Sequence, residues 1–175
     1  MQKKKIIALT GPKGVGKTSI AKELEERAWE DRCVVSFADP LRRMLSRLVP
    51  IKAMKHPQLK EEPIEWLGGK SPRQLLQSLG TEWGRNMISE TIWIDAMRQT
   101  IPAQPFNTVI IDDCRFENEA KMVREMDGIV IRLKRKGIEY SEEHASEMPV
   151  RNADFLIDAG NVNVAADLIE QIIHS

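Results

Sequence analysis

The glycine-rich run from Gly11 to Thr18 constrains the fold of this chain more than any other feature, because it fits G-x-x-x-x-G-K-[ST] at every specified position. The apolar residues 6–9 precede it, and residues 19–29 follow with apolar side chains at helical spacing. This order predicts a buried strand, a phosphate-binding loop and a helix. The glycines at 11, 14 and 16 do not meet the dinucleotide pattern G-x-G-x-x-G, so a nicotinamide or flavin enzyme is disfavoured.

Such a loop binds polyphosphates, because backbone N–H groups point inward at a helix N-terminus and glycine lets the phosphates approach. Lys17 is expected to reach the β- and γ-phosphates of ATP, and the Thr18 hydroxyl to ligate Mg²⁺. The residues expected to hold the cofactor ATP are Gly11, Lys13, Gly14, Val15, Gly16, Lys17, Thr18 and Ser19, together with Asn161 after the last predicted strand.

The length and composition indicate one domain, large enough to bury a hydrophobic core without stabilising disulfides or metal ions. The chain has 175 residues, and its 26 basic and 26 acidic side chains cancel, which argues against a nucleic-acid partner bound through a broad cationic surface. Cys33 and Cys114 lie far apart and form no disulfide or zinc pattern, which fits a reducing cytoplasm. The apolar run at 6–9 is too short for a signal sequence or a membrane span, so no membrane partner is expected.

Apolar periodicity predicts an α/β fold. We expect strands at residues 6–9, 33–38, 108–111, 128–133 and 153–157, and helices at 19–29, 41–48, 71–85, 89–100, 118–126 and 164–173. Pro57, Pro63 and Gly68-Gly69 interrupt residues 50–69, which are expected to form a mobile loop carrying Trp66. The pattern predicts a parallel sheet with right-handed crossovers and a helical insertion between the second and third strands.

Several charged residues follow the predicted strands, where open α/β sheets place their ligands. Asp112 comes after four β-branched residues, as expected for a carboxylate that binds Mg²⁺. Asp113 is the alternative candidate for the same metal-binding role. Asp39 follows the second strand and is either a ligand-binding residue or a helix N-cap. The basic cluster at 134–136 is either a solvated surface loop or a neighbour of the phosphate loop.

Six runs of residues together resemble the phage-type deoxynucleoside monophosphate kinases over nearly the whole chain. They are the phosphate loop, Phe37-Ala38-Asp39-Pro40-Leu41, Leu79-Gly80-Thr81-Glu82-Trp83-Gly84-Arg85, Trp93, residues 112–120 and His144-Ala145-Ser146-Glu147. Asp113-Cys114 stands where the family has Asp-Val, a departure of little weight because cysteine is a small apolar substitute.

The resemblance implies a P-loop NTPase three-layer fold with a five-stranded parallel sheet. The implied division of one kinase domain is a core at 1–38, 106–133 and 152–175, an acceptor-binding insertion at 39–105 and a lid over ATP at 134–151. The implied reaction transfers the γ-phosphoryl of ATP to a deoxynucleoside monophosphate. A homodimer is compatible with the sequence.

The resemblance also implies roles for individual residues. Lys17, Arg85, Arg115, Arg132 and Arg135 are expected in catalysis, with Arg132 and Arg135 as lid arginines or solvated surface residues. Residues expected to bind the acceptor are Asp39, Trp66, Gln74, Thr81, Trp83, Arg85, Asp113 and Arg115, where Trp66 and Trp83 stack on the base or Trp83 belongs to the core. Thr18 and Asp112 are expected to hold Mg²⁺.

Two alternatives remain open at this point. One is a P-loop kinase for another phosphorylated small molecule, such as phosphomevalonate or dephospho-coenzyme A. The other is a regulatory NTP-binding module without an acceptor. A helical insertion with its own arginines and tryptophans favours an acceptor site over a switch.

Overall fold

The computed structural model describes residues 4–140 and 150–175, and it divides the chain into two compact units. The first unit is formed by Met1–Ser36 and Arg98–Ser175, in their described parts, and the second by Phe37–Met97. The run His144–Glu147 and half of the predicted lid, residues 141–149, lie outside the described residues.

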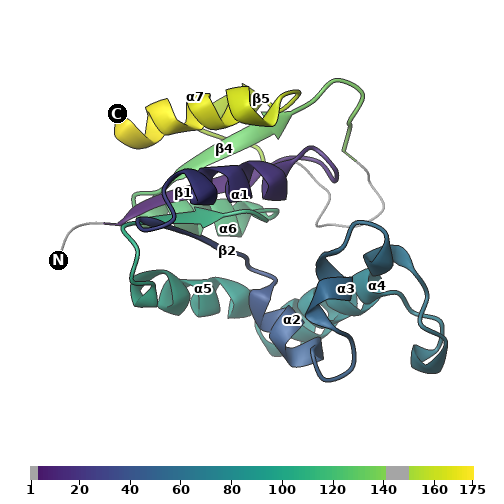
Figure 1. Cartoon of the computed structure of the whole chain (residues 1–175). Helices are drawn as coiled ribbons and strands as arrows, with labels where there is room; N and C mark the ends of the chain where they lie inside the picture. The colour runs from purple at the N-terminus through teal and green to yellow at the C-terminus, as the bar shows by residue number, and fades with distance from the viewer. Residues whose placement is uncertain (1–3, 141–149) are drawn as a thin grey trace. The chain divides into compact units, whose positions relative to one another are not determined.

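The first unit contains a five-stranded sheet in which all neighbouring strands run parallel (Figure 1). Its strands are β1 (Lys5–Thr10), β2 (Arg32–Val35), β3 (Thr108–Ile111), β4 (Ile129–Lys134) and β5 (Phe155–Asp158). They are arranged in the order β2-β3-β1-β4-β5. The predicted fold class is confirmed, although β2 ends at Val35 and residues 36–38 are not part of the strand.

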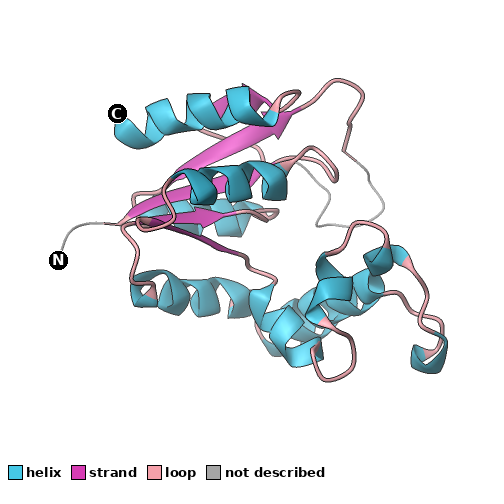
Figure 2. Cartoon of the chain, viewed as in Figure 1, coloured by secondary structure: helices cyan, strands magenta, loops and turns pink. Residues whose placement is uncertain are grey.

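Helices cover this sheet on both faces (Figure 2). Helices α1 (Lys17–Arg27) and α7 (Val162–His174) pack against each other, whereas α6 (Glu117–Glu125) contacts β1 and β4 and lies behind the sheet in Figure 1. The core between the sheet and the α1–α7 layer consists of buried aliphatic side chains, among them Ile7, Leu9, Leu24, Ile110, Ile131 and Ile169. This burial supplies most of the driving force for folding.

The second unit is built from short helices. These are α2 (Asp39–Leu45), α3 (Ile51–Lys55), two 3₁₀ turns at Leu59–Glu61 and Glu65–Leu67, α4 (Pro72–Gln77), a π-helix at Ser78–Ile88 and the beginning of α5 (Ile92–Ala103). The expectation of a loop over residues 50–69 was therefore wrong. Pro50 stands just before α3, where its missing N–H costs nothing, and the later prolines shorten the helices without abolishing them.

The helix predicted from Ser71 to Arg85 begins as expected but changes its winding. Ser71 is the N-cap, and its hydroxyl and the side chain of Gln74 form a capping box. After Gln77 the chain continues as a π-helix, and at its end the Ser89 N–H donates to the Gly84 carbonyl five residues back, at 2.9 Å. A search for the 3.6-residue period does not anticipate this wider turn.

We expect Glu170→Gln to destabilise the first unit. Arg32 is only 4% exposed, and its two terminal nitrogens donate to the Glu170 carboxylate at 2.5 and 2.7 Å. Arg32 holds the pKa of Glu170 below its usual range, so this stabilisation is present at neutral pH and is lost as pH falls through the lowered pKa. Urea unfolding should show a loss of about 2 kcal/mol at pH 7, between the values for exposed and buried pairs.

Glu23→Gln is the matched control, because its partner Arg27 is an exposed residue that also pairs with Asp167. Its loss should stay below about 0.5 kcal/mol. Equal losses for the two variants, or a Glu170→Gln loss that does not shrink in acid, would contradict this account.

Candidate active site

The phosphate loop joins β1 to α1 through three glycines with positive φ. Gly11, Gly14 and Gly16 have φ of 145°, 81° and 112°, values that other residues rarely adopt. A Cβ on Gly11 would also lie 2.6 Å from the carbonyl oxygen of Leu133. The loop conformation therefore requires glycine, whether or not a ligand is bound.

Lys17 lies at the start of α1 with its ammonium folded over this loop. Its Nζ donates to the carbonyl oxygens of Gly11 at 2.6 Å and Pro12 at 2.9 Å, and the residue is 9% exposed. The positive charge is thus fixed above the loop by the loop's own backbone. Val15 is buried under the loop, whereas Lys13, Thr18 and Ser19 are exposed.

A buried carboxylate lies next to the loop. The Thr18 hydroxyl donates to Oδ2 of Asp112 at 2.9 Å, and the Ser36 hydroxyl donates to Oδ1 of the same residue at 2.6 Å. Asp112 follows β3, which neighbours β1 at the centre of the sheet. Connections from these strands lead to opposite faces, so their carboxyl ends form the crevice in which α/β sheets bind ligands.

Ser36 is a site residue that sequence reasoning missed. It is 6% exposed and directly follows Val35, the last residue of β2. β2 pairs with β3, which brings Ser36 to the same end of the sheet as Asp112. The available signal was its position after a strand, but a single serine there carries no motif.

The segment after Asp112 is shaped by a buried glutamate. Glu119 is 2% exposed, and its Oε2 accepts the backbone N–H groups of Arg115 at 2.7 Å and Phe116 at 3.1 Å. This capping arrangement fixes the turn that carries the half-buried Arg115. Asp113 is buried, and burial raises the pKa of the Cys114 thiol well above its ordinary value, so this thiol stays protonated.

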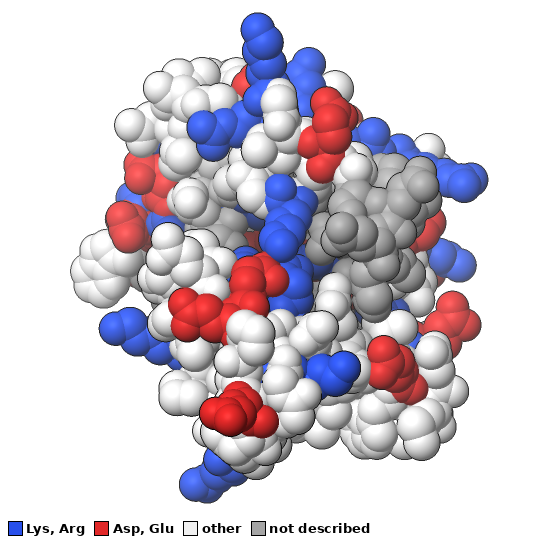
Figure 3. Space-filling view, turned by 90° about the vertical axis from the view of Figure 1, so that its right-hand side faces the viewer, with Lys and Arg blue, Asp and Glu red and all other residues white. Residues whose placement is uncertain are grey.

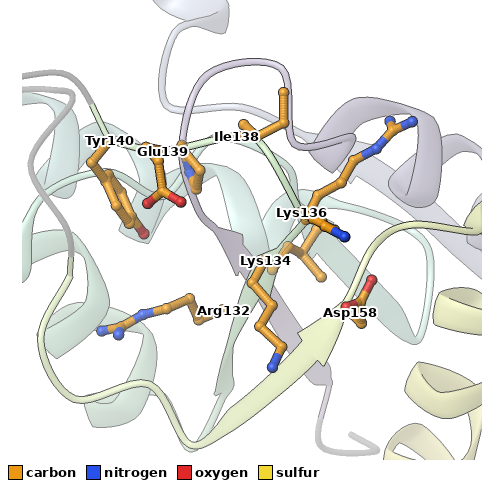
Figure 4. Close-up of a pocket in the computed structure, with 10 residues that line it drawn as sticks. Arg132, Lys134, Lys136, Ile138, Glu139, Tyr140 and Asp158 are labelled. Carbon is orange, nitrogen blue, oxygen red and sulfur yellow. The ribbon is translucent and has the colours of Figure 1, made fainter.

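A pocket of about 420 Å³ adjoins the phosphate loop (Figure 4). Its lining consists of Pro12, Arg132, Leu133, Lys134, Arg135, Lys136, Ile138, Glu139, Tyr140 and Asp158. The pocket thus joins the loop to the basic cluster that follows β4, as one of the two sequence interpretations expected. Burial raises the pKa of Tyr140, so its hydroxyl remains protonated at neutral pH.

The two predicted lid arginines differ in the structure. Arg132 donates through Nη2 to the backbone carbonyl oxygens of Val150 and Arg151, and it lies on the Tyr140 side of the pocket (Figure 4). Arg135 is exposed at the start of a turn closed by the Ile138 N–H, at 3.1 Å from the Arg135 carbonyl oxygen. Arg132 therefore connects residues 150–151 to β4, whereas Arg135 is exposed at the surface.

Two residues predicted to contact ligands have helix-capping contacts. Oδ1 of Asn161 accepts from the Asn163 and Val164 N–H groups at 2.9 and 3.2 Å, as the N-cap of α7. Oε1 of Gln74 accepts from the Ser71 N–H at 2.9 Å. These contacts give each side chain a structural role.

The other predicted acceptor residues lie in the second unit. The π-helix carries Thr81, Trp83 and Arg85, all half-buried, with Nη1 of Arg85 3.4 Å from the Glu90 carbonyl oxygen. Trp66 is 67% exposed on a 3₁₀ turn. Asp39 is not the N-cap of α2, a position held by Ala38; it lies in the first turn and accepts from Arg42 at 2.9 Å.

Charges of both signs are interspersed over the face shown in Figure 3. This agrees with the zero net charge of the sequence. Within the ranges 4–140 and 150–175, no helix is both long and apolar enough to cross a membrane.

The parallel sheet, the phosphate loop and the buried aspartate define a protein with the P-loop NTPase fold. The fold resembles that of APS kinase from Mycobacterium tuberculosis, with a TM-score of 0.53 and 15% identity over the whole of both chains. It also resembles shikimate kinase from Aquifex aeolicus, with a TM-score of 0.57 and 11% identity over 97% of this chain and 96% of that one. These likenesses concern the fold alone.

The sequence narrows this class to one family. Residues 51–172 match the family model described as deoxynucleotide monophosphate kinase. A protein of Acanthamoeba polyphaga mimivirus, named for the same activity, is 30% identical over 164 residues, which cover 84% of this chain and 82% of that protein. The deoxynucleoside-5'-monophosphate kinase of Escherichia phage T5 is 37% identical over 68 residues, or 36% of this chain and 27% of the phage protein.

The chain belongs to the deoxynucleotide monophosphate kinase family. The resemblance seen in the sequence is confirmed, and the chain is an ATP-dependent nucleotide kinase. Neither a kinase for phosphomevalonate or dephospho-coenzyme A nor a regulatory NTP-binding module is favoured by these relatives.

Proposed function

We propose that this kinase transfers the γ-phosphoryl of Mg²⁺-bound ATP to a deoxynucleoside monophosphate, with ATP held by the first unit and the acceptor by residues 39–105. The observation that carries the proposal is the phosphate loop with Lys17 fixed above it and Thr18 bonded to Asp112. A monophosphate oxygen is already a competent nucleophile. The enzyme must therefore mainly position the two substrates and neutralise charge.

The donor site uses backbone and side chain together. N–H groups of residues 14–18 at the N-terminus of α1 suit the phosphates of ATP. The Lys17 ammonium, already above the loop, offsets the negative charge of the β- and γ-phosphates. The pocket lined by Pro12 and the residues after β4 would receive the nucleoside of ATP, with Arg135 rather than Arg132 available to the phosphates.

The residues beside the loop fit Mg²⁺. This ion usually takes one or two protein oxygens and completes its shell with phosphate and water. The Thr18 hydroxyl and the Asp112 carboxylate provide these oxygens 2.9 Å apart, and Ser36 holds the second carboxylate oxygen at 2.6 Å. When bound, the ion supplies charge neutralisation at the phosphates.

The acceptor site is assigned to the second unit, and Arg115 of the first unit is a separate candidate for binding phosphate. Arg85 is the main candidate to fork onto the acceptor phosphate, because a guanidinium binds a phosphate through two parallel hydrogen bonds. Thr81 and Trp83 share its π-helix, a form of winding often associated with functional sites. Trp66, exposed by 67%, is available for base stacking. Asp39 and Gln74 complete the proposed set in this unit, and Asp113 of the first unit is a further candidate for contact with the acceptor.

The proposal can be tested with an acceptor panel. ADP release should be measured with the four deoxynucleoside monophosphates, the matching ribonucleotides, dephospho-coenzyme A, phosphomevalonate and water. We expect turnover with at least one deoxynucleotide to exceed all the others. ADP release that is independent of any acceptor would reject the proposal. This reaction fits a location in the cytoplasm, because ATP and deoxynucleoside monophosphates are both present there.

We expect Arg85→Ala to raise the KM for the deoxynucleotide about thirtyfold, because a charge-assisted contact to the acceptor phosphate is lost. The KM for ATP should change less than twofold. Arg85→Lys should recover only part of the loss, because an ammonium cannot reproduce the fork. Steady-state kinetics with each substrate varied in turn gives both constants.

Arg47→Ala is the matched control, since Arg47 is an exposed arginine of the same unit and its loss changes the charge equally. Its constants should stay near those of the unmodified enzyme. If Arg85→Ala raises the KM for ATP and the KM for the deoxynucleotide equally, or changes neither, the assignment is wrong. Arg85 would then have only a structural role at a helix end.

A further inference from the structure

The polar atom of one buried tryptophan is directed at the π-helix of the second unit. Trp93 lies in α5 and is 5% exposed. Its indole Nε1–H donates to the carbonyl oxygen of Gly80 at 2.7 Å. Gly80 belongs to the π-helix that carries Thr81, Trp83 and Arg85. A second helix of the same unit is thus bonded to the backbone of the proposed acceptor segment.

The Gly80 carbonyl oxygen, which accepts the hydrogen bond from Trp93, belongs to the same helical turn as Arg85. In a π-helix the N–H of a residue pairs with the carbonyl five residues earlier, which for Arg85 is that of Gly80. A carbonyl oxygen has two lone pairs, so it can accept from both the helix and the indole. The Trp93 bond therefore acts on the turn that ends at Arg85.

The indole ring also fixes this turn by close contact. A Cβ on Gly84, the residue before Arg85, would lie 2.5 Å from Cζ2 of Trp93 and 2.8 Å from Nε1. The ring thus lies directly against the backbone of Gly84. Trp83 contacts the ring from within the π-helix, with ring centroids 6.3 Å apart and planes tilted by 41°. Glycine at 84 is explained by this contact, without a direct role in ligand binding.

We propose that Trp93 is a positioning residue for the acceptor phosphate: its hydrogen bond to Gly80 and its contact with Gly84 set the place of the Arg85 guanidinium. The inference rests on the proposed function of Arg85. Trp93 itself is 5% exposed and its one polar atom is bonded to backbone, so we do not expect it to contact the substrate. Its effect must therefore pass through the turn between Gly80 and Arg85.

Two changes at position 93 test the inference. Trp93→Phe keeps an aromatic ring and removes the donor. Replacement of the same side chain by benzothienylalanine, in which sulfur takes the place of N–H, keeps the shape of the indole as well. Each should raise the KM for the deoxynucleotide about fivefold to tenfold, the size expected for one buried hydrogen bond, and leave the KM for ATP within twofold. Trp29→Phe, at a 69% exposed residue of the first unit, is the control for loss of a tryptophan.

Arg85→Ala and the double variant with Trp93→Phe belong in the same assay. If Trp93 acts through Arg85, the double variant should be no worse toward the acceptor than Arg85→Ala alone. A large acceptor effect of Arg85→Ala with no effect of the benzothienylalanine variant would overturn the inference and leave the proposed function intact. Equal increases in both KM values at position 93 would also overturn it, as a purely structural effect. An Arg85→Ala variant with normal acceptor kinetics would reject the proposed function and the inference together.

Discussion

Lys17→Ala is expected to lower kcat with every accepted deoxynucleotide by at least about a hundredfold, on the order of 3 kcal/mol in the barrier. The ammonium lies 2.6 and 2.9 Å from two carbonyl oxygens of the phosphate loop, so its charge is already in place before ATP binds. Such a preorganised charge needs little rearrangement when negative charge shifts during transfer. Its removal should therefore affect turnover more than the affinity for the acceptor.

The same substitution removes two hydrogen bonds that hold the loop, so the fold must be checked separately. Circular dichroism and the Tm without nucleotide should change little, because the glycines at 11, 14 and 16 set the loop conformation. Lys22→Ala, at an exposed lysine of the same helix, gives the matched loss of charge. The kinase assignment of this loop fails if Lys17→Ala retains near-normal turnover, or if Lys22→Ala is equally damaging.

The strands of the first unit could be predicted because their signal is local. Residues 108–111 are consecutive β-branched residues, and the structure has β3 at Thr108–Ile111, fully buried. The β1 and α1 elements follow from the phosphate-loop motif, which requires a strand before it and a helix after it. The proximity of Thr18 to Asp112, 94 residues away, is predictable for the same reason, because the carboxyl ends of parallel strands share one edge of a sheet.

The second unit could not be predicted equally well, because its structure depends on contacts between helices. The π-helix exists where Gly80 and Gly84 let Leu41 and Trp93 approach the backbone. An amphipathic pattern contains no information about these partners. Likewise, Ser36 acquires its role only when β2 and β3 pair and bring its hydroxyl to Asp112.

The Asp112→Asn variant should lose about a hundredfold in kcat at moderate Mg²⁺ and recover part of this loss when Mg²⁺ is raised. An amide offers one neutral oxygen where the carboxylate offers two charged ones, so a metal is held less firmly. One of the Thr18 and Ser36 hydroxyls can rotate to accept from the new NH₂ group while the other still donates to the amide oxygen, so the fold should survive. Turnover measured against Mg²⁺ concentration, together with ATP binding in the presence of a chelator, separates the metal effect from loss of the nucleotide site.

Asp113→Asn is the comparison that decides which carboxylate serves the metal. Asp113 is 9% exposed and Asp112 7%, so the two substitutions are matched in burial, chain position and charge. Asp112 is hydrogen-bonded to Thr18, which follows Lys17 in the first turn of α1 and carries the other proposed metal oxygen. Asp113→Asn should therefore leave the Mg²⁺ dependence of turnover unshifted, even where it weakens acceptor binding. If Asp113→Asn shifts the Mg²⁺ dependence of turnover and Asp112→Asn does not, then Asp113 rather than Asp112 is the metal ligand.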